Sequence, residues 1–220
     1  MANSVLVIAD SGTGKSTSIR TLDPKETFII NIANKPLPFK GWKSKYTQIT
    51  KDNPKGNLTS AATAPGIIKA MRHVNDKMGH IKTIVVDDWQ YMSSFEYFDR
   101  ANEKGYEKFT QIAANLAQVA KLPKDLRDDL TIIFLTHSED STDINGNRKI
   151  KAKTVGKMID NTLTLEGLFS IVLFGKVNKN DDGELEYGFE TQNNGENTCK
   201  SPQGIFEERF IPNNLQYVKD

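Results

Sequence analysis

The chain has little of what marks a secreted or membrane-spanning protein. It holds one cysteine, Cys199, among 220 residues, so no disulfide can form within the chain, which fits a reducing compartment. No activating partner can be assigned to this thiol, so we expect it to be structural. No apolar run approaches the roughly 18 residues of a membrane span, and no basic region followed by an apolar core opens the sequence. These absences predict a cytoplasmic protein with no membrane partner.

Net charge is almost absent as well. The 29 lysines and arginines and the 28 aspartates and glutamates give +1, so nucleic-acid binding must come from a local patch rather than from the whole protein. Hydrophobic residues make up 37% and charged residues 26%, as in folded rather than disordered chains. We expect a single domain over residues 1–220, with a core over about 1–175 and a C-terminal hairpin and tail over about 176–220.

What the chain does have begins at its first apolar run. Val5-Leu6-Val7-Ile8 has the length of a buried strand, and residues 9–16 after it read Ala-Asp-Ser-Gly-Thr-Gly-Lys-Ser. A helix-compatible stretch over 15–22 follows. Glycines in such a loop let backbone N–H groups turn toward phosphate oxygens, and the helix adds its positive end. This order predicts a phosphate-binding P-loop, although Ala9 stands where the pattern usually has glycine.

The residues of this loop have expected roles. Lys15 can reach the β- and γ-phosphates of ATP, and the Ser16 hydroxyl can bind Mg²⁺. The alternative is a glycine-rich turn with a chance lysine, which the coincidence of strand, loop and helix disfavours. The predicted nucleotide-binding residues are Ser11, Gly12, Thr13, Gly14, Lys15, Ser16 and Thr17.

The remaining pattern predicts an α/β fold. Strands alternate with helices through residue 136, which favours a mostly parallel sheet with helices on both faces. The last third adds antiparallel hairpin strands, and Asn145-Gly146 is a hairpin-turn signal. Strands are expected over 5–9, 27–32, 81–87, 130–136, 169–174 and 185–190, with a short one over 46–49, and helices over 65–77, 92–102 and 106–121.

Two acids, Asp87 and Asp88, end the strand over residues 81–87. A carboxylate at this strand end can hold Mg²⁺ against the β- and γ-phosphates, so we assign metal binding to Asp87 together with Ser16. We expect Asp88 to orient or polarise the attacking water, as a catalytic residue beside Lys15. The other interpretation is a strand that simply ends in two solvated aspartates, and the P-loop makes it the weaker one.

The strand over residues 130–136 also ends in polar residues. In ATPases where an extra strand separates the P-loop strand from the acid-tipped strand, a polar side chain at the tip of the extra strand senses the γ-phosphate. Thr136 and His137 fit this position, and we assign the catalytic sensor role to His137. A histidine at a strand end is also often only a satisfied polar group.

A basic segment covers residues 145–157 and contains no acid. Alternation places Lys149, Lys151 and Lys153 on one face of a strand. A row of cations binds nucleic-acid phosphates without reading sequence, but a solvated hairpin has the same pattern, and charge alone leaves the two interpretations even. The DNA-binding candidates are Arg148, Lys149, Lys151, Lys153 and Lys157.

Two other nucleotide-using classes lack their signatures. The few arginines form no recognisable lid cluster of a small-molecule kinase, and Asn34-Lys35 continues with Pro36-Leu37 rather than as the Asn-Lys-x-Asp segment of a GTPase. A nucleotide or small-molecule kinase is therefore the third hypothesis, after a DNA-dependent ATPase and a non-hydrolysing ATP-gated binding module.

Taken together, the motifs resemble a known group, the phage-encoded RecA-core ATPases of the Sak-four type. These are single-strand-annealing recombination proteins of a phage AAA-type nucleotide-binding family. The resemblance covers most of the chain. The segments that carry it are Ser11-Gly12-Thr13-Gly14-Lys15-Ser16-Thr17, Asn34-Lys35-Pro36-Leu37-Pro38, Val85-Val86-Asp87-Asp88, Leu135-Thr136-His137-Ser138-Glu139, Leu165-Glu166-Gly167-Leu168-Phe169 and Lys200-Ser201-Pro202.

The resemblance implies a RecA-like P-loop NTPase core that uses ATP with Mg²⁺ and binds single-stranded DNA. It also implies a role in phage recombination or replication, in the host cytoplasm, and assembly into a homo-oligomer. A single-stranded-DNA-binding protein is a further expected partner.

The chain departs from the RecA-like pattern at its second strand. RecA-like recombinases generally place a catalytic glutamate after this strand, which here ends Ile32-Ala33-Asn34. Either Asp88 supplies the function, or hydrolysis is slow and the protein works mainly by binding ATP. Neighbouring subunits of RecA-like filaments also contribute a cation, for which the candidates are Lys151, Lys153 and Lys176.

Overall fold

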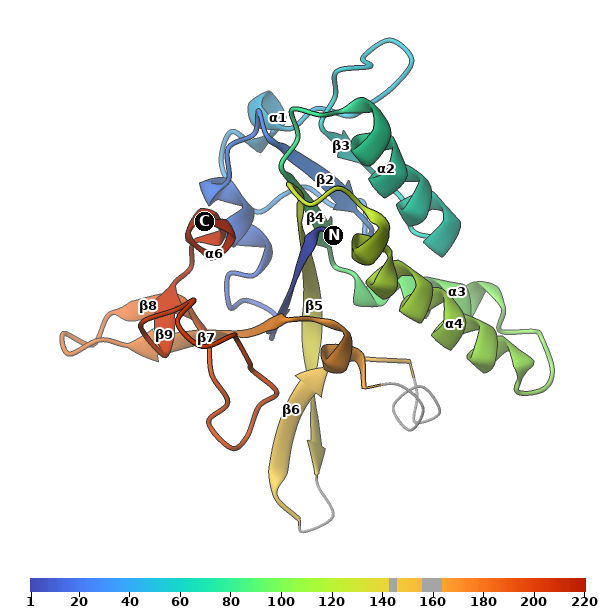
Figure 1. The fold of residues 1–220 in the computed structure, drawn as a ribbon. Helices are drawn as coiled ribbons and strands as arrows, with labels where there is room; N and C mark the ends of the chain where they lie inside the picture. The colour runs from blue at the N-terminus through green and yellow to red at the C-terminus, as the bar shows by residue number, and fades with distance from the viewer. Residues whose placement is uncertain (143–145, 156–163) are drawn as a thin grey trace.

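A nine-stranded sheet forms the centre of the part of the molecule that is described, residues 1–142, 146–155 and 164–220 of a computed structural model (Figure 1). Its order is β3-β2-β4-β5-β1-β7-β8-β9, and β6 pairs with β5. The strands are β1 (Asn3–Ala9), β2 (Thr27–Asn31), β3 (Leu58–Thr59), β4 (Thr83–Asp87), β5 (Thr131–Thr142), β6 (Arg148–Ala152), β7 (Ile171–Lys179), β8 (Leu185–Glu190) and β9 (Phe210–Pro212).

The central strands are parallel and the later ones antiparallel. β1 pairs in parallel with β5 and β7, and β4 pairs in parallel with β2 and β5. β8 and β9 extend the sheet beyond β7 with antiparallel pairing, and β6 folds back on β5 in the same sense. The predicted α/β sheet is therefore confirmed, and β5 lies between β1 and β4, as the sensor assignment requires.

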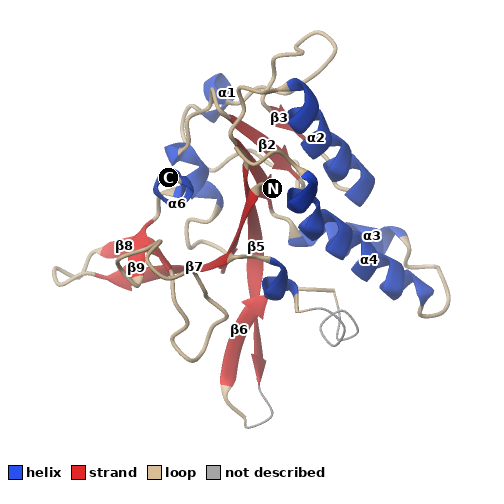
Figure 2. Ribbon diagram, in the orientation of Figure 1, coloured by secondary structure: helices blue, strands red, loops and turns tan. Residues whose placement is uncertain are grey.

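Alternating side chains along each strand fill two apolar layers, one on each face of the sheet, and Figure 2 shows the helices around the sheet. In β1, Leu6 and Ile8 belong to the layer covered by α2, α3 and α4, whereas Val5 and Val7 belong to the layer covered by η1 and α6. Helices on both faces are thus confirmed. The helical elements are η1 (Ser16–Thr21), α1 (Trp42–Lys45), α2 (Ala64–Lys77), α3 (Gln90–Asp99), α4 (Glu107–Lys121), η2 (Leu122–Asp125), η3 (Leu165–Leu168) and α6 (Leu215–Lys219).

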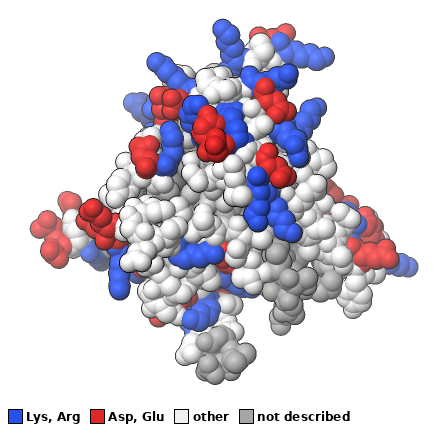
Figure 3. Space-filling view, viewed as in Figure 1, with Lys and Arg blue, Asp and Glu red and all other residues white. Residues whose placement is uncertain are grey.

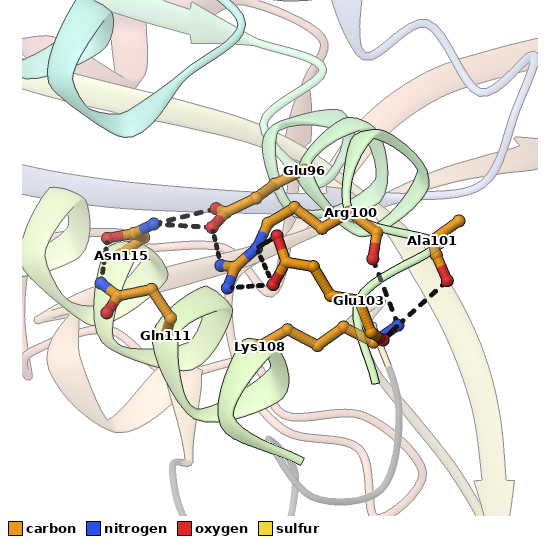
Figure 4. Close-up of polar contacts among 7 residues, drawn as sticks. All are labelled: Glu96, Arg100, Ala101, Glu103, Lys108, Gln111 and Asn115. Atoms are coloured by element: carbon orange, nitrogen blue, oxygen red, sulfur yellow. Dashed lines mark hydrogen bonds and ion pairs between the residues drawn. The ribbon is translucent and has the colours of Figure 1, made fainter. Parts of the chain in front are cut away.

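Polar contacts join α3 to α4 (Figure 4). The buried Lys108 ammonium donates to the carbonyl oxygens of Arg100, Ala101 and Glu103, at 3.3, 3.5 and 3.0 Å. These three residues follow the end of α3, so Lys108 fixes the turn that leads from α3 to α4. On the next turns, Glu96 accepts from Arg100 and from Asn115 of α4. These contacts hold the C-terminal end of α3 in place. Its N-terminal end lies beside the acids of β4.

The segment after the P-loop is not the α-helix expected over 15–22 but the shorter 3₁₀ helix η1. Hydroxyl groups explain the tighter winding, because Ser18 Oγ donates to the carbonyl of Lys15 at 2.5 Å and Thr21 Oγ1 to that of Ser18 at 2.7 Å. Side-chain bonds three residues back compete with the α-helical pattern.

The prediction of a short strand over 46–49 is also wrong. That region holds only the isolated bridge of Gln48 with Leu58, because the Asn57 side chain binds the backbone N–H of Thr47 at 2.9 Å and the carbonyl of Pro24 at 2.8 Å, which shapes a loop. The strand at this edge is β3, and the short helix α1 precedes it.

Two borders differ from the sequence pattern. β5 continues past residue 136 to Thr142, and the pairing of Thr142 with Arg148 confirms the predicted hairpin, although Asn145 of its turn lies outside the described residues. The expected core border near residue 175 falls inside β7.

None of the helices in the described ranges is long and apolar enough to cross a membrane.

Candidate nucleotide site

The P-loop curls over the carboxyl end of β1. Gly12 and Gly14 have φ angles of +85° and +87°, a conformation that side chains with a Cβ disfavour. Thr13 Oγ1 ties the loop by donating to the carbonyl of Asp10 at 2.8 Å. Ala9 is tolerated where the pattern usually has glycine because the neighbouring position on β7 is Gly175, whose added Cβ would lie only 2.7 Å from that of Ala9.

The loop meets the acids of β4 directly. The Lys15 ammonium lies 2.8 Å from Asp88 Oδ1, and the Ser16 hydroxyl donates to Asp87 Oδ1 at 2.7 Å. Lys15, Asp87 and Asp88 are 5%, 2% and 1% exposed, so these charges are withdrawn from water and depend on one another. The structure thus brings together the lysine, hydroxyl and acids that the sequence analysis assigned to one site, while their roles stay predictions.

Asp88 has three basic neighbours. Besides Lys15, the Lys35 ammonium forms an ion pair with its second oxygen, and His137 Nε2 lies 3.6 Å from Oδ1. Burial alone raises the pKa of Asp88, but the contacts with His137, Lys15 and Lys35 outweigh it and hold the pKa well below its ordinary value. Burial instead raises the pKa of Asp87, because Lys15 offsets only part of that effect.

The tip of β5 lies beside this cluster. His137 pairs in register with Ala9 of the P-loop strand, and its backbone N–H donates to Gln90 Oε1 at 3.1 Å. Thr136 Oγ1 approaches the same amide oxygen at 3.4 Å. The amide of α3 thereby holds the end of β5, and the His137 ring faces Asp88.

The loop and the acids fit ATP with Mg²⁺. Mg²⁺ favours oxygen ligands, usually one or two protein groups completed by phosphates and water, and the adjacent Ser16 hydroxyl and Asp87 carboxylate supply such oxygens. No cluster of three or more His, Cys, Asp or Glu suited to a metal occurs in the described part of the chain. The curled loop leaves the space beside Gly12 open, with no atom within 4 Å of an added Cβ.

The C-terminal strands support the P-loop from behind. Asn213, which follows β9, donates through Nδ2 to the carbonyl of Gly14 at 3.2 Å and accepts from Arg20 of η1 at 3.0 Å. The backbone N–H of Leu215, at the start of α6, donates to Thr21 at 2.9 Å. This support was not predicted, since residues 200–220 have little periodicity.

The basic segment forms the second strand of a hairpin that projects from the body (Figure 1). Its cations are largely paired: Arg148 contacts Asp140 at 2.9 Å and Lys151 contacts Glu139 at 3.2 Å, both acids of β5, and Lys149 donates to the carbonyl of Gly195. Lys153 is exposed just past the end of β6. Lys157 lies outside the described residues.

The candidates for a cation contributed to a neighbouring subunit also differ in their surroundings. Lys176 pairs with Glu190 at 2.8 Å and Lys151 with Glu139. Lys153 donates its backbone N–H to the carbonyl of His137 at 2.8 Å, which links the end of β6 to the residue that the sequence predicted to be the sensor.

Lys35, Gln90 and Asn213 are site residues that sequence reasoning missed. Lys35 carried a signal, because Asn34-Lys35 stands where the RecA-like pattern has its glutamate. Asn34 adopts φ +51°, which turns the chain after β2 back toward Asp88. Gln90 and Asn213 carried none, because each acts on a segment distant in sequence.

Comparison with known families supports the nucleotide-site interpretation. A family model described as an AAA domain matches residues 1–203. The match covers the P-loop, the acids of β4, the tip of β5 and the hairpin. No curated protein matches the sequence.

Proposed function

Since the chain belongs to the AAA-domain family of P-loop nucleotide-binding ATPases, we propose that it hydrolyses ATP in a reaction coupled to single-stranded DNA. Following the resemblance to the Sak-four type, the proposed setting is phage recombination or replication in the host cytoplasm. There the protein would anneal or exchange strands as a homo-oligomer, with a single-stranded-DNA-binding protein as partner.

One observation carries this proposal: β5 is a single unbroken strand that joins the nucleotide site to the hairpin. His137 stands on it beside Asp88, and two residues later Glu139 pairs with Lys151 of β6. A shift of His137 toward a γ-phosphate therefore moves the strand that carries the basic hairpin. Packed elements of this kind transmit small displacements because they deform little within themselves.

The residues present can perform the nucleotide chemistry. On ATP binding, Lys15 would leave Asp88 and contact the β- and γ-phosphates. The oxygens of Ser16 and Asp87 would hold Mg²⁺, which would supply positive charge against those phosphates. Asp88 stays ionised beside Lys35 and His137 and orients the attacking water. His137 donates to the γ-phosphate and so distinguishes ATP from ADP.

A non-hydrolysing, ATP-gated binding module is the second candidate, and the surroundings of Asp88 favour it. A carboxylate with a strongly lowered pKa accepts a proton poorly, so Asp88 can orient water but is a weak general base. No acid follows β2 to replace it. This candidate predicts tight ATP binding with negligible turnover.

Measuring ATP turnover with and without single-stranded DNA tests the proposal. We expect turnover that rises with DNA and is lost in Lys15→Ala. Turnover that is robust and lost in Asp88→Asn excludes the binding module, whereas tight ATP binding without turnover selects it. Absence of both turnover and salt-sensitive DNA affinity contradicts both, and phosphate transfer to a nucleoside would identify a kinase.

A further inference from the structure

A second basic surface lies far from the hairpin, in a segment whose sequence has weak patterning. Residues 35–55 contain six lysines and a single acid, Asp52. Five of these lysines are exposed and form no ion pair within the described residues. This lysine-rich surface consists of Lys40, Lys43, Lys45, Lys51 and Lys55.

The lysine-rich surface lies over α1 and the loop that leads to β3. Figure 3 shows lysine and arginine side chains projecting at the top of the molecule, where Figure 1 has α1 and this loop, while the β5–β6 hairpin points away at the opposite end. The lysines of the lysine-rich surface therefore face solvent, and their charges are available to a ligand. By contrast, Arg148 and Lys151 of the hairpin pair with acids.

A cavity of about 480 Å³ opens beside Lys43, one of these lysines, and its volume is within the range of about 300–1,000 Å³ that is typical of small-ligand pockets. Its wall combines the half-buried ring of Trp42 with Lys35, Lys43 and Asn31. The Lys43 ammonium lies 5.8 Å from the centre of the Trp42 ring. The cavity thus offers a flat aromatic surface with cations at its rim.

Asn31 gives the cavity an unsatisfied polar group. It is 4% exposed, and its Nδ2 donates to the carbonyl of Lys35 at 2.7 Å. Its Oδ1 is buried without a hydrogen-bond partner in the described part of the chain. Such a buried acceptor lowers stability when nothing donates to it, and a ligand in the cavity that brings a donor would satisfy it.

We propose that this cavity and the lysine-rich surface bind single-stranded nucleic acid, with one base in the cavity. A base presents a π-face to Trp42 and N–H donors to Asn31, while the backbone phosphates on either side meet the lysines. Aromatic rings interleaved with cations bind single strands in this way, and stacking tolerates any base. A free anion would use neither the ring nor the amide.

The site is connected to ATP chemistry through Lys35. This lysine lines the cavity and also pairs with Asp88, and Asn31 is the register neighbour of Asp87 across β2 and β4. A strand that attracts the Lys35 ammonium loosens its hold on Asp88, the residue assigned to orient water. This step rests on the proposed function, whereas binding in the cavity does not.

Tryptophan fluorescence gives a direct readout, because the chain has two tryptophans. Trp89 is fully buried against Phe134 and Phe169, whereas Trp42 lines the cavity. We expect an oligothymidine strand to quench the emission with a saturable, salt-sensitive curve, and Trp42→Phe to abolish the quenching while the protein still folds. Quenching of the same size in Trp42→Phe would overturn the proposal.

A charge variant tests the surface without touching the ring. Lys45→Gln with Lys51→Gln should weaken strand binding and reduce the slope of log affinity against log salt by about 0.7 for each phosphate that is no longer neutralised. The matched control is Lys121→Gln with Lys124→Gln, two exposed lysines at the amino edge of the sheet, where Pro123 binds the backbone of Ala2. An unchanged slope, or the same change in the control, would count against the site.

Further outcomes separate this proposal from the proposed function. If only neutralisation of the hairpin weakens DNA binding, the inference fails and the DNA-coupled ATPase stands. If the oligonucleotide binds at the cavity but never changes ATP turnover, the site stands and the coupling fails. Quenching by mononucleosides at concentrations where the strand has no effect would instead make the cavity a small-molecule site and overturn the inference.

Discussion

At the scale of single residues, the most constrained group is Asp88. Its carboxylate is nearly inaccessible to water and touches Lys15, Lys35 and His137. A buried charge is stabilised only by such partners, and removal of one side leaves the others uncompensated. Asp88 also has φ +58°, which places it where its neighbour Trp89 can donate to the carbonyl of Leu135 at 2.9 Å.

Asp88→Asn should therefore reduce the free energy of unfolding in the absence of nucleotide by about 3 kcal/mol. The matched control is Asp129→Asn, since Asp129 pairs with Lys82 and Arg127 at the surface and should cost less than about 1 kcal/mol. Denaturant titration near neutral pH measures both. Equal losses of unfolding free energy in the two variants would mean that the charge of Asp88 does not hold the surrounding cluster together.

Cys199 permits a prediction on pH. Burial raises the pKa of this thiol above its ordinary value of 9.0, so the native state keeps a proton that the unfolded chain releases. The thiol's contribution to stability is complete below pH 9.0 and declines as pH rises above it. We expect wild type to lose stability faster than Cys199→Ala above that pH, and the native thiol to react slowly with a disulfide reagent until denaturant is added. Rapid native labelling would contradict this.

At the scale of elements, β8, β9 and α6 act as a support for the P-loop. Asn213 reaches the loop only because β9 lies against β8, where Gly188 pairs with Pro212. An added Cβ at Gly188 would collide with the carbonyl of Ile211. The support thus depends on a glycine for close approach of two backbones.

Gly188→Ala should destabilise the protein by about 1–3 kcal/mol through overpacking and weaken binding of a fluorescent ATP analogue. Gly79→Ala is the control, because an added Cβ there meets nothing within 4 Å. Asn213→Ala separates the two effects, since it removes the hydrogen bond to Gly14 while β9 keeps its place. Nucleotide affinity that is unchanged in Asn213→Ala would show that the support is only structural.

The β5–β6 hairpin carries its own prediction at this scale. Neutralising Lys149, Lys151 and Lys153 together should flatten the salt dependence of single-stranded DNA binding by about 0.7 for each phosphate that the hairpin no longer binds, with ATP binding intact. Because Lys151 already pairs with Glu139, we expect a smaller change than three free cations would give. An unchanged salt slope would mean that the hairpin is only a solvated hairpin and does not bind DNA.

At the scale of the whole molecule, the nucleotide site lies between two basic regions, the lysine-rich surface and the hairpin, which point to opposite ends of the molecule in Figure 1. Each region is connected to Asp88, one through Lys35 and the other through His137. In the proposed mechanism ATP would draw Lys15 away from Asp88, and binding at the nucleotide site would then alter both connections.

Linkage makes this coupling reciprocal: ATP and single-stranded DNA must change each other's affinity by the same factor. Typical couplings correspond to about 5–150-fold. Anisotropy of labelled DNA with a non-hydrolysable ATP analogue, and titration of the analogue with saturating DNA, should agree. Lys15→Ala should remove the effect, and independent binding of the two ligands would contradict the coupling.

Local sequence determined the parts of this protein whose chemistry depends on neighbouring residues. The apolar run before Gly12 and Gly14, and the acids at the end of the third long strand, predicted the nucleotide end of an α/β sheet because strand length, glycine freedom and side-chain type are local properties. The separation of β1 from β4 by β5 was likewise expected and confirmed.

Tertiary structure alone decided what surrounds those parts. Lys35 meets Asp88, Asn213 meets Gly14, and the acids of β5 neutralise cations of β6 that form an acid-free run in the sequence. The lysines near Trp42 show no periodicity, yet the fold places Lys35 and Lys43 in the wall of one cavity. Each of these contacts joins segments distant along the chain, and strand order, register and loop paths, which set such distances, are not encoded in any local pattern.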